Sequence, residues 1–250
     1  MRCQMDEKRM IEGRRPVLEA LQAGSKITRI LLQKGSSGKP VNEVLALAEK
    51  LAIPIEYREK AALEKLAVTR NHQGILAETP PFRYTPFEEL LTLQKGEPLF
   101  LVLLDHVQDP HNLGALIRTA YAAGCHGVVI PERRAAQMTP SAVRTSAGAA
   151  EYLPVAQVVN IARCLDQCKE AGLWVYGADM GGEMLYPNGD YKGAVALVIG
   201  SEGEGLSRLV KEKCDYLVRL PMRGKVASLN ASVAGALLFY EVYRQREGLN

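Results

Sequence analysis

Residues 98–120 read PLFLVLLDHVQDPHNLGALIRTA, a buried-strand pattern followed directly by a helical one. The run 98–104 is apolar throughout and lacks the alternation of a half-exposed strand, which is typical of a strand covered on both faces. Asp109 and Pro110 end this strand, and the apolar residues that follow recur at helical spacing. A buried strand joined in this way to a helix predicts an α/β fold with a parallel sheet.

Three later segments repeat the buried-strand pattern: HGVVI (126–130), LWVYG (173–177) and AVALVIG (194–200). Helices are expected between and after them, at 113–123, part of 139–149, 158–171, 205–213 and 230–246. Residues 98–250 are therefore predicted to form one α/β domain with a mostly parallel sheet. In such sheets ligands collect at the carboxyl ends of the strands.

The first 78 residues predict a separate, smaller α/β domain. Helices are expected at 15–24, 41–52 and 60–68, and strands at 27–34, 53–57 and 72–79. Residues 1–78 carry a net charge of +4 and the remainder −1, which favours a polyanionic partner such as RNA for this part. Solubilising loop polarity explains the same charges about equally well. The candidate RNA-binding residues of its loops are Arg14, Arg15, Lys34, Lys39, Arg70 and His72.

Residues 79–97 are expected to be a linker. The stretch TPPFRYTPFEELLTLQKGE contains three prolines, which interrupt hydrogen-bonded ladders and stiffen the chain, before a short helical patch. The predicted domains are thus 1–78 and 98–250.

The composition excludes several classes of protein. Hydrophobic residues make up 47% and charged residues 24% of the 250 positions, as in ordinary packed domains. No apolar run is long enough to span a bilayer, and residues 1–10 lack the apolar core of a secretory signal, so we expect a cytoplasmic protein. The five cysteines are scattered without the spacing of zinc ligands, which predicts reduced, mostly buried thiols and no metal site.

The first of three loops that could carry chemistry is the opening stretch. Asn112 is a good helix N-cap, and small residues flank Arg118 on its own helix face, at Gly114, Ala115 and Ala122. These small residues leave room for an anion beside the arginine. The alternative, in which Arg118 pairs with a surface carboxylate, is favoured from spacing alone.

The second loop, VIGSEGEGLSRLV (198–210), places glycines at 200, 203 and 205 between a strand and a helix. Glycines let backbone approach a ligand closely, but Glu202 and Glu204 would repel a phosphate. The glutamates either stabilise the helix N-terminus or belong to a site for a neutral or cationic small molecule.

The third loop is LPMRGKVASLNASVAGALLF (220–239). Pro221 ends a strand, and a polar segment leads into a helix that is expected to run to about Arg246. Ser228 and Asn230 lie at the entry to this helix, and either could be a simple cap.

Together the three loops resemble the signature motifs of the SpoU/TrmH family of RNA ribose 2′-O-methyltransferases. The matching stretches are Asn-x-Gly-x-x-x-Arg at 112–118, Ile-Gly-Ser-Glu-Gly-x-Gly-Leu at 199–206 and Ser-Leu-Asn-x-Ser-x-Ala at 228–234. The stretch RNHQGILA at 70–77 extends the resemblance into the first domain.

The resemblance implies a trefoil-knotted SPOUT methyltransferase domain with S-adenosylmethionine as its cofactor. It also implies a homodimer with the C-terminal helix at the interface, and a first domain similar to RNA-binding ribosomal proteins. The cofactor would contact backbone at Gly200, Leu220 and Leu229, with Pro221 and Met222 in the same segment. The residues carried over to the catalytic site are Asn112, Arg118, Glu202, Ser228 and Asn230.

The resemblance also bears on the role of each catalytic residue. Arginine stays protonated to above about pH 12, so we interpret Arg118 as a cation that holds an RNA phosphate and steadies the forming alkoxide. It would act as a base only in unusual surroundings. Asn112 would hold Arg118 or the ribose, and Ser228 and Asn230 would orient the hydroxyl and the loop. Glu202 would organise its loop and position the substrate.

The two-domain layout resembles the bacterial enzymes that methylate a guanosine ribose in 23S ribosomal RNA. Two alternatives keep the chemistry and change the RNA: a tRNA ribose, or a ribosomal site that confers antibiotic resistance. A third alternative, of another class, is a non-catalytic RNA-binding factor of ribosome assembly. A nucleotide-dependent oxidoreductase is disfavoured because Gly-x-Gly-x-x-Gly does not follow a first strand.

Overall fold

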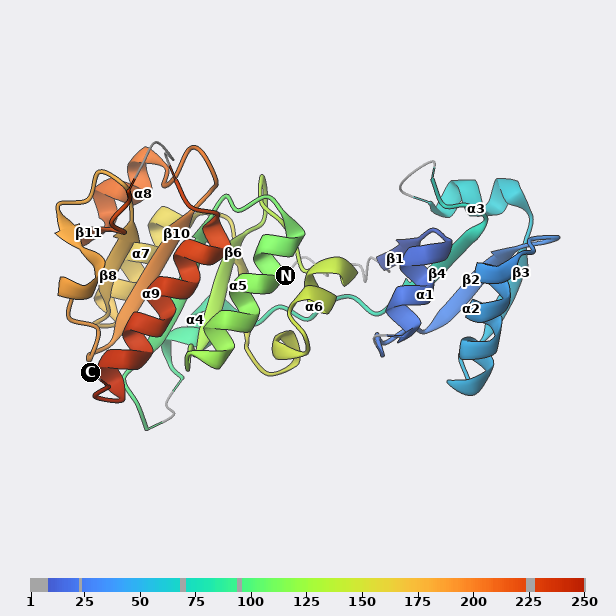
Figure 1. The fold of residues 1–250 in the computed structure, drawn as a ribbon, viewed down its shortest axis with the longest axis horizontal. Coiled ribbons are helices and arrows are strands. Elements are labelled where there is room, and N and C mark those ends of the chain that lie inside the picture. The colour runs from blue at the N-terminus through green and yellow to red at the C-terminus, as the bar shows by residue number, and fades with distance from the viewer. Residues whose placement is uncertain (1–8, 23, 68–70, 94–95, 224–227, 250) are drawn as a thin grey trace. The chain divides into compact units, whose positions relative to one another are not determined.

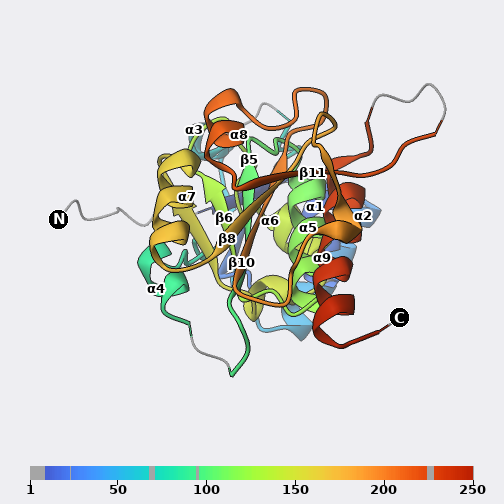
Figure 2. The same cartoon turned by 90° about the vertical axis from the view of Figure 1, so that its left-hand side faces the viewer.

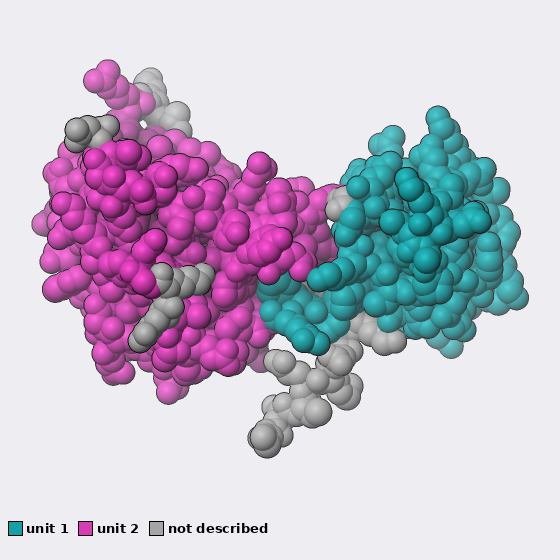
Figure 3. Space-filling model, turned by 90° about the horizontal axis from the view of Figure 1, so that it is seen from below, with its two compact units in different colours: residues 1–83 teal, residues 84–250 magenta. Residues whose placement is uncertain are grey.

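The computed structural model describes residues 9–22, 24–67, 71–93, 96–223 and 228–249. The chain forms two compact units, Met1–Arg83 and Tyr84–Asn250, which Figure 3 colours separately. Each unit has its own sheet and its own core, and each is described by itself.

The first unit has a four-stranded sheet in the order β1-β4-β2-β3. Strand β4 is antiparallel to β1 and β2, and β3 is parallel to β2. The carboxyl ends of β1, β2 and β3 and the beginning of β4 therefore share one edge of the sheet. The elements are β1 (Arg9–Glu12), α1 (Arg14–Gln22), β2 (Arg29–Gln33), α2 (Lys39–Lys50), β3 (Ile55–Arg58), α3 (Lys60–Leu66) and β4 (Ile75–Thr79).

Both faces of this sheet are covered. Helices α1 and α2 pack on one face through residues such as Val17 and Val44, and Leu63 of α3 packs with Leu31 and Leu76 in a smaller core. The predicted α/β layering is present, with the addition of β1, which the sequence did not indicate. Strand β1 spans only four residues and pairs with one neighbour, so its sequence pattern is short.

The second unit is built on a seven-stranded sheet in the order β7-β6-β5-β10-β8-β11-β9, and every pairing in it is parallel. Its strands are β5 (Phe100–Asp105), β6 (Gly127–Pro131), β7 (Val155–Val158), β8 (Trp174–Ala178), β9 (Met184–Leu185), β10 (Val195–Gly200) and β11 (Tyr216–Arg219). Its helices are α4 (Phe87–Leu91), α5 (Pro110–Ala122), α6 (Pro140–Thr145), α7 (Ile161–Glu170), α8 (Arg208–Lys213) and α9 (Ala231–Arg246), with short 3₁₀ turns at Ala149–Glu151 and Tyr186–Asn188.

Helices cover the sheet on both sides (Figures 1 and 2). Helices α4, α7 and α8 lie on one face, and α5, α6 and α9 lie on the other. Burial on both faces explains the unbroken apolar runs, since all six residues of β5 and all five of β6 are buried. The predicted α/β fold with a mostly parallel sheet is confirmed.

The range 79–97 does more than connect the two units. Helix α4 lies in this range, and its Phe87 and Leu90 are buried in the core of the second unit together with residues of β5 and α7. The border between the compact units falls at Arg83 and Tyr84.

The strand order brings distant loops together. Strand β10 lies between β5 and β8, and its Gly200 is in register with Asp105 at the end of β5. The loops that follow β5, β10 and β11 therefore leave the sheet at the same edge. Among the residues that the structure describes, no helix combines the length and the apolar character of a membrane span.

Candidate active site

Three side chains, one from each loop that carries a motif, form a hydrogen-bonded cluster in the second unit. Asn112 donates from Nδ2 to Oε1 of Glu202 at 2.8 Å, and Asn230 donates from Nδ2 to Oδ1 of Asn112 at 3.0 Å. Asn230 Nδ2 also donates to Oε1 of Glu202. We call Asn112, Glu202 and Asn230 the polar triad.

Asn230 links the polar triad to helix α9. It is the N-cap of this helix, and its Oδ1 accepts from the backbone N–H groups of Ser232 at 2.9 Å and Val233 at 3.3 Å. Because the oxygen faces these donors, the amide nitrogen must face Glu202 and Asn112. The capping and site interpretations of Asn230 therefore hold together.

Asn112 does not cap helix α5, and the sequence-based interpretation of it as a cap was wrong. The cap is Asp109, whose side chain accepts from the backbone N–H of His111 at 2.9 Å, and the helix begins at Pro110. Proline is well tolerated there because the first helical N–H has no intrahelical acceptor. The side chain of Asn112, two residues into the helix, is free to join the polar triad.

The loop that carries Glu202 is a tight glycine turn. Ser201 and Gly205 exchange backbone hydrogen bonds at 3.1 and 3.0 Å, and Gly203 has a φ of +90°. A Cβ on Gly200 would lie 2.2 Å from the carbonyl carbon of Gly205, so only glycine fits there. The turn thereby holds Glu202 in place between two asparagines.

Asp105 joins the same region, and the sequence did not single it out. Its carboxylate is 1% exposed, accepts from the backbone N–H of Ser207 at 2.6 Å and lies 2.6 Å from Nδ1 of His106. It therefore ties the end of β5 to the loop after β10. A charged residue at the end of an otherwise apolar run is the signal that could have identified it.

Arg118 is exposed on α5, six residues beyond Asn112, and makes no hydrogen bond or ion pair with any residue in the described ranges. The pairing with a surface carboxylate that spacing favoured is therefore not present. The structure does not bring Arg118 into the polar triad within one chain. It leaves a permanent cation open to solvent on the helix that carries Asn112.

Ser228 also stays outside the polar triad. It is exposed and makes no hydrogen bond with the described part of the chain. The segment 224–227 that precedes it lies outside the described residues.

The expected cofactor segments meet at the carboxyl edge of the sheet. Gly200 ends β10, Leu220 follows β11 directly, and Leu229 precedes the cap of α9. Leu220 is buried, Met222 and Leu229 are half-buried, and Pro221 is exposed.

These residues fit S-adenosylmethionine in two respects. The peptide groups of Leu220, Met222 and Leu229 make no backbone hydrogen bond with other described residues, so they are open to a ligand. Their apolar side chains suit the adenine and thioether parts of the cofactor, and the nearby carboxylate of Glu202 suits a sulfonium cation better than a phosphate.

Five of the six candidate RNA-binding residues of the first unit are described; Arg70 lies outside the described residues. Arg14 and His72 line a shared hollow. Lys34 is exposed and pairs with Glu59 at 2.8 Å. Arg15 and Lys39 are exposed at the first turns of α1 and α2.

The four cysteines that the structure describes do not contribute a reactive group. Cys125, Cys164, Cys168 and Cys214 are free thiols, and burial raises the pKa of Cys164 to about 11 and of Cys125 to about 12. Thiols with such pKa values carry almost no thiolate at neutral pH. Cys3 lies outside the described residues.

Family models match both units. Residues 99–240 match the SpoU rRNA methylase family, and residues 10–85 match the substrate-binding domain of RNA 2′-O ribose methyltransferases. The fold and the two family models thus define the class as RNA methyltransferases, and the chain belongs to the SpoU/TrmH family, whose cofactor is S-adenosylmethionine.

Individual relatives cover nearly the whole chain. A Bacillus subtilis protein assigned to the TrmH family of tRNA/rRNA methyltransferases is 45% identical over 94% of each chain. A Staphylococcus aureus protein with the same assignment is 42% identical over 96% of this chain and 97% of its own.

Solved structures agree in fold. The SpoU methyltransferase AviRb from Streptomyces viridochromogenes, in complex with AdoMet, is 26% identical and aligns with a TM-score of 0.67 over 97% of this chain and 92% of its own. An AdoMet-bound rRNA methyltransferase from Sinorhizobium meliloti is 28% identical, with a TM-score of 0.64 over 95% and 87% of the two chains.

Proposed function

We propose that this protein transfers a methyl group from S-adenosylmethionine to the 2′-hydroxyl of a guanosine ribose in 23S ribosomal RNA. The observation that carries the proposal is the polar triad, because it joins one residue from each of the three motifs at the edge where the cofactor segments end. The RNA-binding domain model matched by the first unit supports RNA as the substrate.

When bound, S-adenosylmethionine supplies an electrophilic methyl group on a sulfonium. The chain has to place the ribose oxygen in line with that methyl, and positioning of this kind can contribute up to roughly 7–11 kcal/mol. Glu202 uses Oε1 for the two asparagines and for the backbone N–H of Ala231 at 3.3 Å. Its Oε2, which has no partner among the described residues, accepts the hydrogen bond of the 2′-hydroxyl and takes that proton as the oxygen is methylated.

The two asparagines keep Glu202 in its orientation. Arg118, open to solvent, holds the phosphate next to the target ribose through charge-assisted hydrogen bonds and steadies the negative charge that develops on the oxygen. Ser228 contacts the substrate or cofactor from the third loop.

We also propose a homodimer through the second unit. Helix α9 exposes an apolar stripe, Val233, Leu237 and Tyr240, with exposed fractions of 48%, 42% and 50%. These residues lie at i, i+4 and i+7, which is one face of a helix, and the opposite face is buried on the sheet. The trefoil knot and the cytoplasmic location stay predictions.

Two measurements test the function. Calorimetry of the whole chain with S-adenosylmethionine should show binding; no binding would favour the non-catalytic assembly factor. Methyl transfer from labelled cofactor to purified ribosomal RNA and tRNA, followed by mass spectrometry of the nucleosides, should give 2′-O-methylguanosine from 23S RNA. A product from tRNA, or at another ribosomal nucleotide, would assign the alternative targets.

A further inference from the structure

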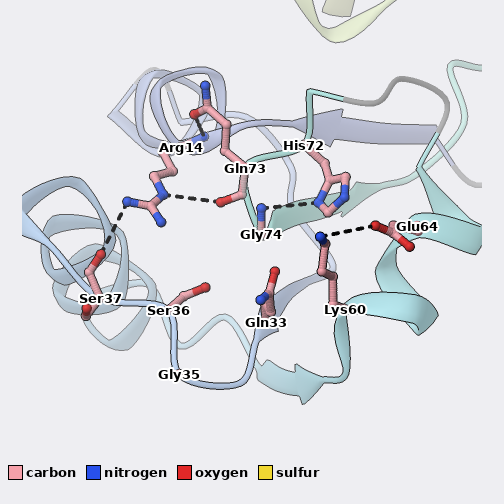
Figure 4. Close-up of a pocket in the computed structure, with 10 residues that line it drawn as sticks. All are labelled: Arg14, Gln33, Gly35, Ser36, Ser37, Lys60, Glu64, His72, Gln73 and Gly74. Atoms are coloured by element: carbon pink, nitrogen blue, oxygen red, sulfur yellow. Dashed lines mark hydrogen bonds and ion pairs between the residues drawn. The ribbon is translucent and has the colours of Figure 1, made fainter.

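A hollow of about 700 Å³ opens in the first unit, at the sheet edge that all four strands share (Figure 4). Arg14 follows β1, Gln33 ends β2, Lys60 follows β3, and His72 precedes β4. This volume lies in the range of small-molecule and nucleotide sites. The loops after β1, β2 and β3 and the loop before β4 thus build one site, although they are far apart in the sequence.

Several polar groups that line the hollow have no partner in the described part of the chain. The side-chain amide of Gln33 and the hydroxyl of Ser36 make no hydrogen bond there, and Lys60 has only a long ion pair of 3.7 Å with Glu64. Arg14 uses Nε and one terminal nitrogen on the carbonyls of Gln73 and Ser37, both at 3.2 Å. Its second terminal nitrogen has no interaction with the residues drawn in Figure 4 and is available to a ligand.

His72 adds a buried group to the same wall. It is 6% exposed, and its Nδ1 accepts from the backbone N–H of Gly74 at 3.2 Å. Because Nδ1 is the acceptor in this hydrogen bond, Nε2 is the ring nitrogen that can donate to a ligand.

The turn after His72 is held in a costly conformation. Gln73 has a φ of +52° and Gly74 a φ of +79°. A non-glycine residue in the left-handed region costs about 1 kcal/mol or more and is concentrated at binding sites. A Cβ on Gly74 would lie 2.9 Å from Oγ of Ser36, so the turn packs closely against the loop after β2.

The lining chemistry selects a ligand. Two cations, one carboxylate (Glu64) and several donors face the hollow, and no Phe, Tyr or Trp among the described residues lines it, so the site offers mainly phosphate contacts and base-edge hydrogen bonds. We propose that this hollow binds one unpaired nucleotide of the substrate RNA, with its phosphate between Arg14 and Lys60 and its base edge against Gln33 and Ser36. The choice of RNA rests on the proposed function.

Binding of two RNAs to the whole chain tests the proposal. Both are hairpins with the same number of phosphates; one carries a single bulged nucleotide and the other is fully paired. We expect the wild type to prefer the bulged RNA, and Lys60→Ala to weaken its binding roughly tenfold. The logarithm of the association constant decreases with the logarithm of the salt concentration. For Lys60→Ala the magnitude of this slope should be smaller by roughly 0.7–0.9, as for one lost phosphate contact.

Gln33→Ala separates base reading from charge. It should weaken binding of the bulged RNA roughly fivefold, leave the salt slope unchanged and reduce the discrimination among the four nucleotides at the bulge. The matched control is Lys50→Ala, which removes a lysine in the last turn of α2, at the other edge of the sheet, and should bind as the wild type does.

Equal binding of both RNAs by the wild type would overturn the proposal, and so would unchanged binding of the bulged RNA by Lys60→Ala. Displacement of the RNA by an equimolar nucleoside 5′-monophosphate would also overturn it, because the hollow would then be a site for free nucleotides. If the two variants bind the bulged RNA more weakly while the wild type does not bind S-adenosylmethionine, the methyltransferase proposal fails and the nucleotide site stands. If methyl transfer occurs and the variants bind as the wild type, the nucleotide site fails alone.

Discussion

Asn230 donates a hydrogen bond to Asn112 at 3.0 Å across 118 residues of sequence. One asparagine caps the last helix and the other lies in the first turn of α5, so a single contact joins two of the three motif loops. The same amide nitrogen also donates to Glu202, which belongs to the remaining motif loop, the one after β10. The three side chains therefore act as one unit, and removing one breaks hydrogen bonds that orient the other two.

A double-mutant cycle between Asn112 and Glu202 should show this coupling. We expect Glu202→Ala and Asn112→Ala each to reduce methyl transfer roughly 100-fold, and the double variant to lose less than the product of the two. The coupling energy should lie at about 0.5–3 kcal/mol, as for residues in direct contact. Glu204→Ala is the control, because Glu204 is exposed in the same turn and has no partner among the described residues. If the losses of methyl transfer in the two single variants simply add in free energy in the double variant, the polar triad does not act as a unit.

Arg118→Ala should lose methyl transfer by roughly 100-fold while the dissociation constant for S-adenosylmethionine changes little. Arg118→Lys should also fail because lysine lacks the planar fork that binds a phosphate through two hydrogen bonds. Single-turnover assays and calorimetry measure the two effects. The control is Arg163→Ala, which changes an exposed arginine on α7, on the other face of the sheet, and should keep the wild-type rate of methyl transfer. A wild-type rate in Arg118→Ala would show that Arg118 does not belong to the site.

Gly114→Ala should destabilise the second unit. The new Cβ would lie 2.5 Å from the carbonyl oxygen of Ala142 and 2.6 Å from Cβ of Thr145, so α5 and α6 would have to separate. We expect a loss of roughly 1–3 kcal/mol, larger than the gain of about 1 kcal/mol in helix propensity. Urea unfolding followed by the fluorescence of Trp174, the single tryptophan, reports on this unit. Gly193→Ala, with no atom within 4 Å of the new Cβ, should be nearly neutral.

Glu241 should make the stability of the second unit depend on pH. The guanidinium of Arg244, at 2.8 and 2.9 Å, holds the pKa of this buried carboxyl below its ordinary value, with help from Gln245. A carboxylate with a lowered folded-state pKa stabilises the fold above its unfolded pKa, of about 4.3, and this stabilisation is lost as the pH falls through the folded-state value.

The difference in the free energy of unfolding between the wild type and Glu241→Gln should therefore be largest near neutral pH and become smaller in acid. Urea unfolding across that range measures it. Glu247→Gln, an exposed glutamate at the end of the same helix, should show no such trend, and a difference that stays constant with pH would refute the assignment.

Leu237→Glu should convert a dimer to a monomer in sedimentation velocity experiments, because it places a charge in the middle of the exposed apolar stripe of α9. Val159→Glu changes another exposed apolar residue, 83% exposed, and should leave the assembly unchanged. A wild type that sediments as a monomer at all concentrations would rule out the proposed homodimer.

Local patterns predicted much of this fold. The unbroken apolar runs at 98–104 and 194–200 indicated buried parallel strands, because only side chains covered on both faces can be apolar at every position. Glycine and asparagine at defined spacings marked the three motif loops. Strands β1, β7 and β9 were missed because four, four and two residues give too short a pattern to read.

The sequence by itself thus determined the class of fold, the order of its longer elements and the residue types available for chemistry, since these depend on periodicity and on short-range backbone preferences. Only the tertiary structure decided that Asp109 and not Asn112 caps α5, that Asp105 fastens the loop after β10, and that Gln33, Lys60 and His72 share one hollow. Those relationships depend on strand order, which places residues far apart in the chain at one edge of a sheet, and no local pattern records it.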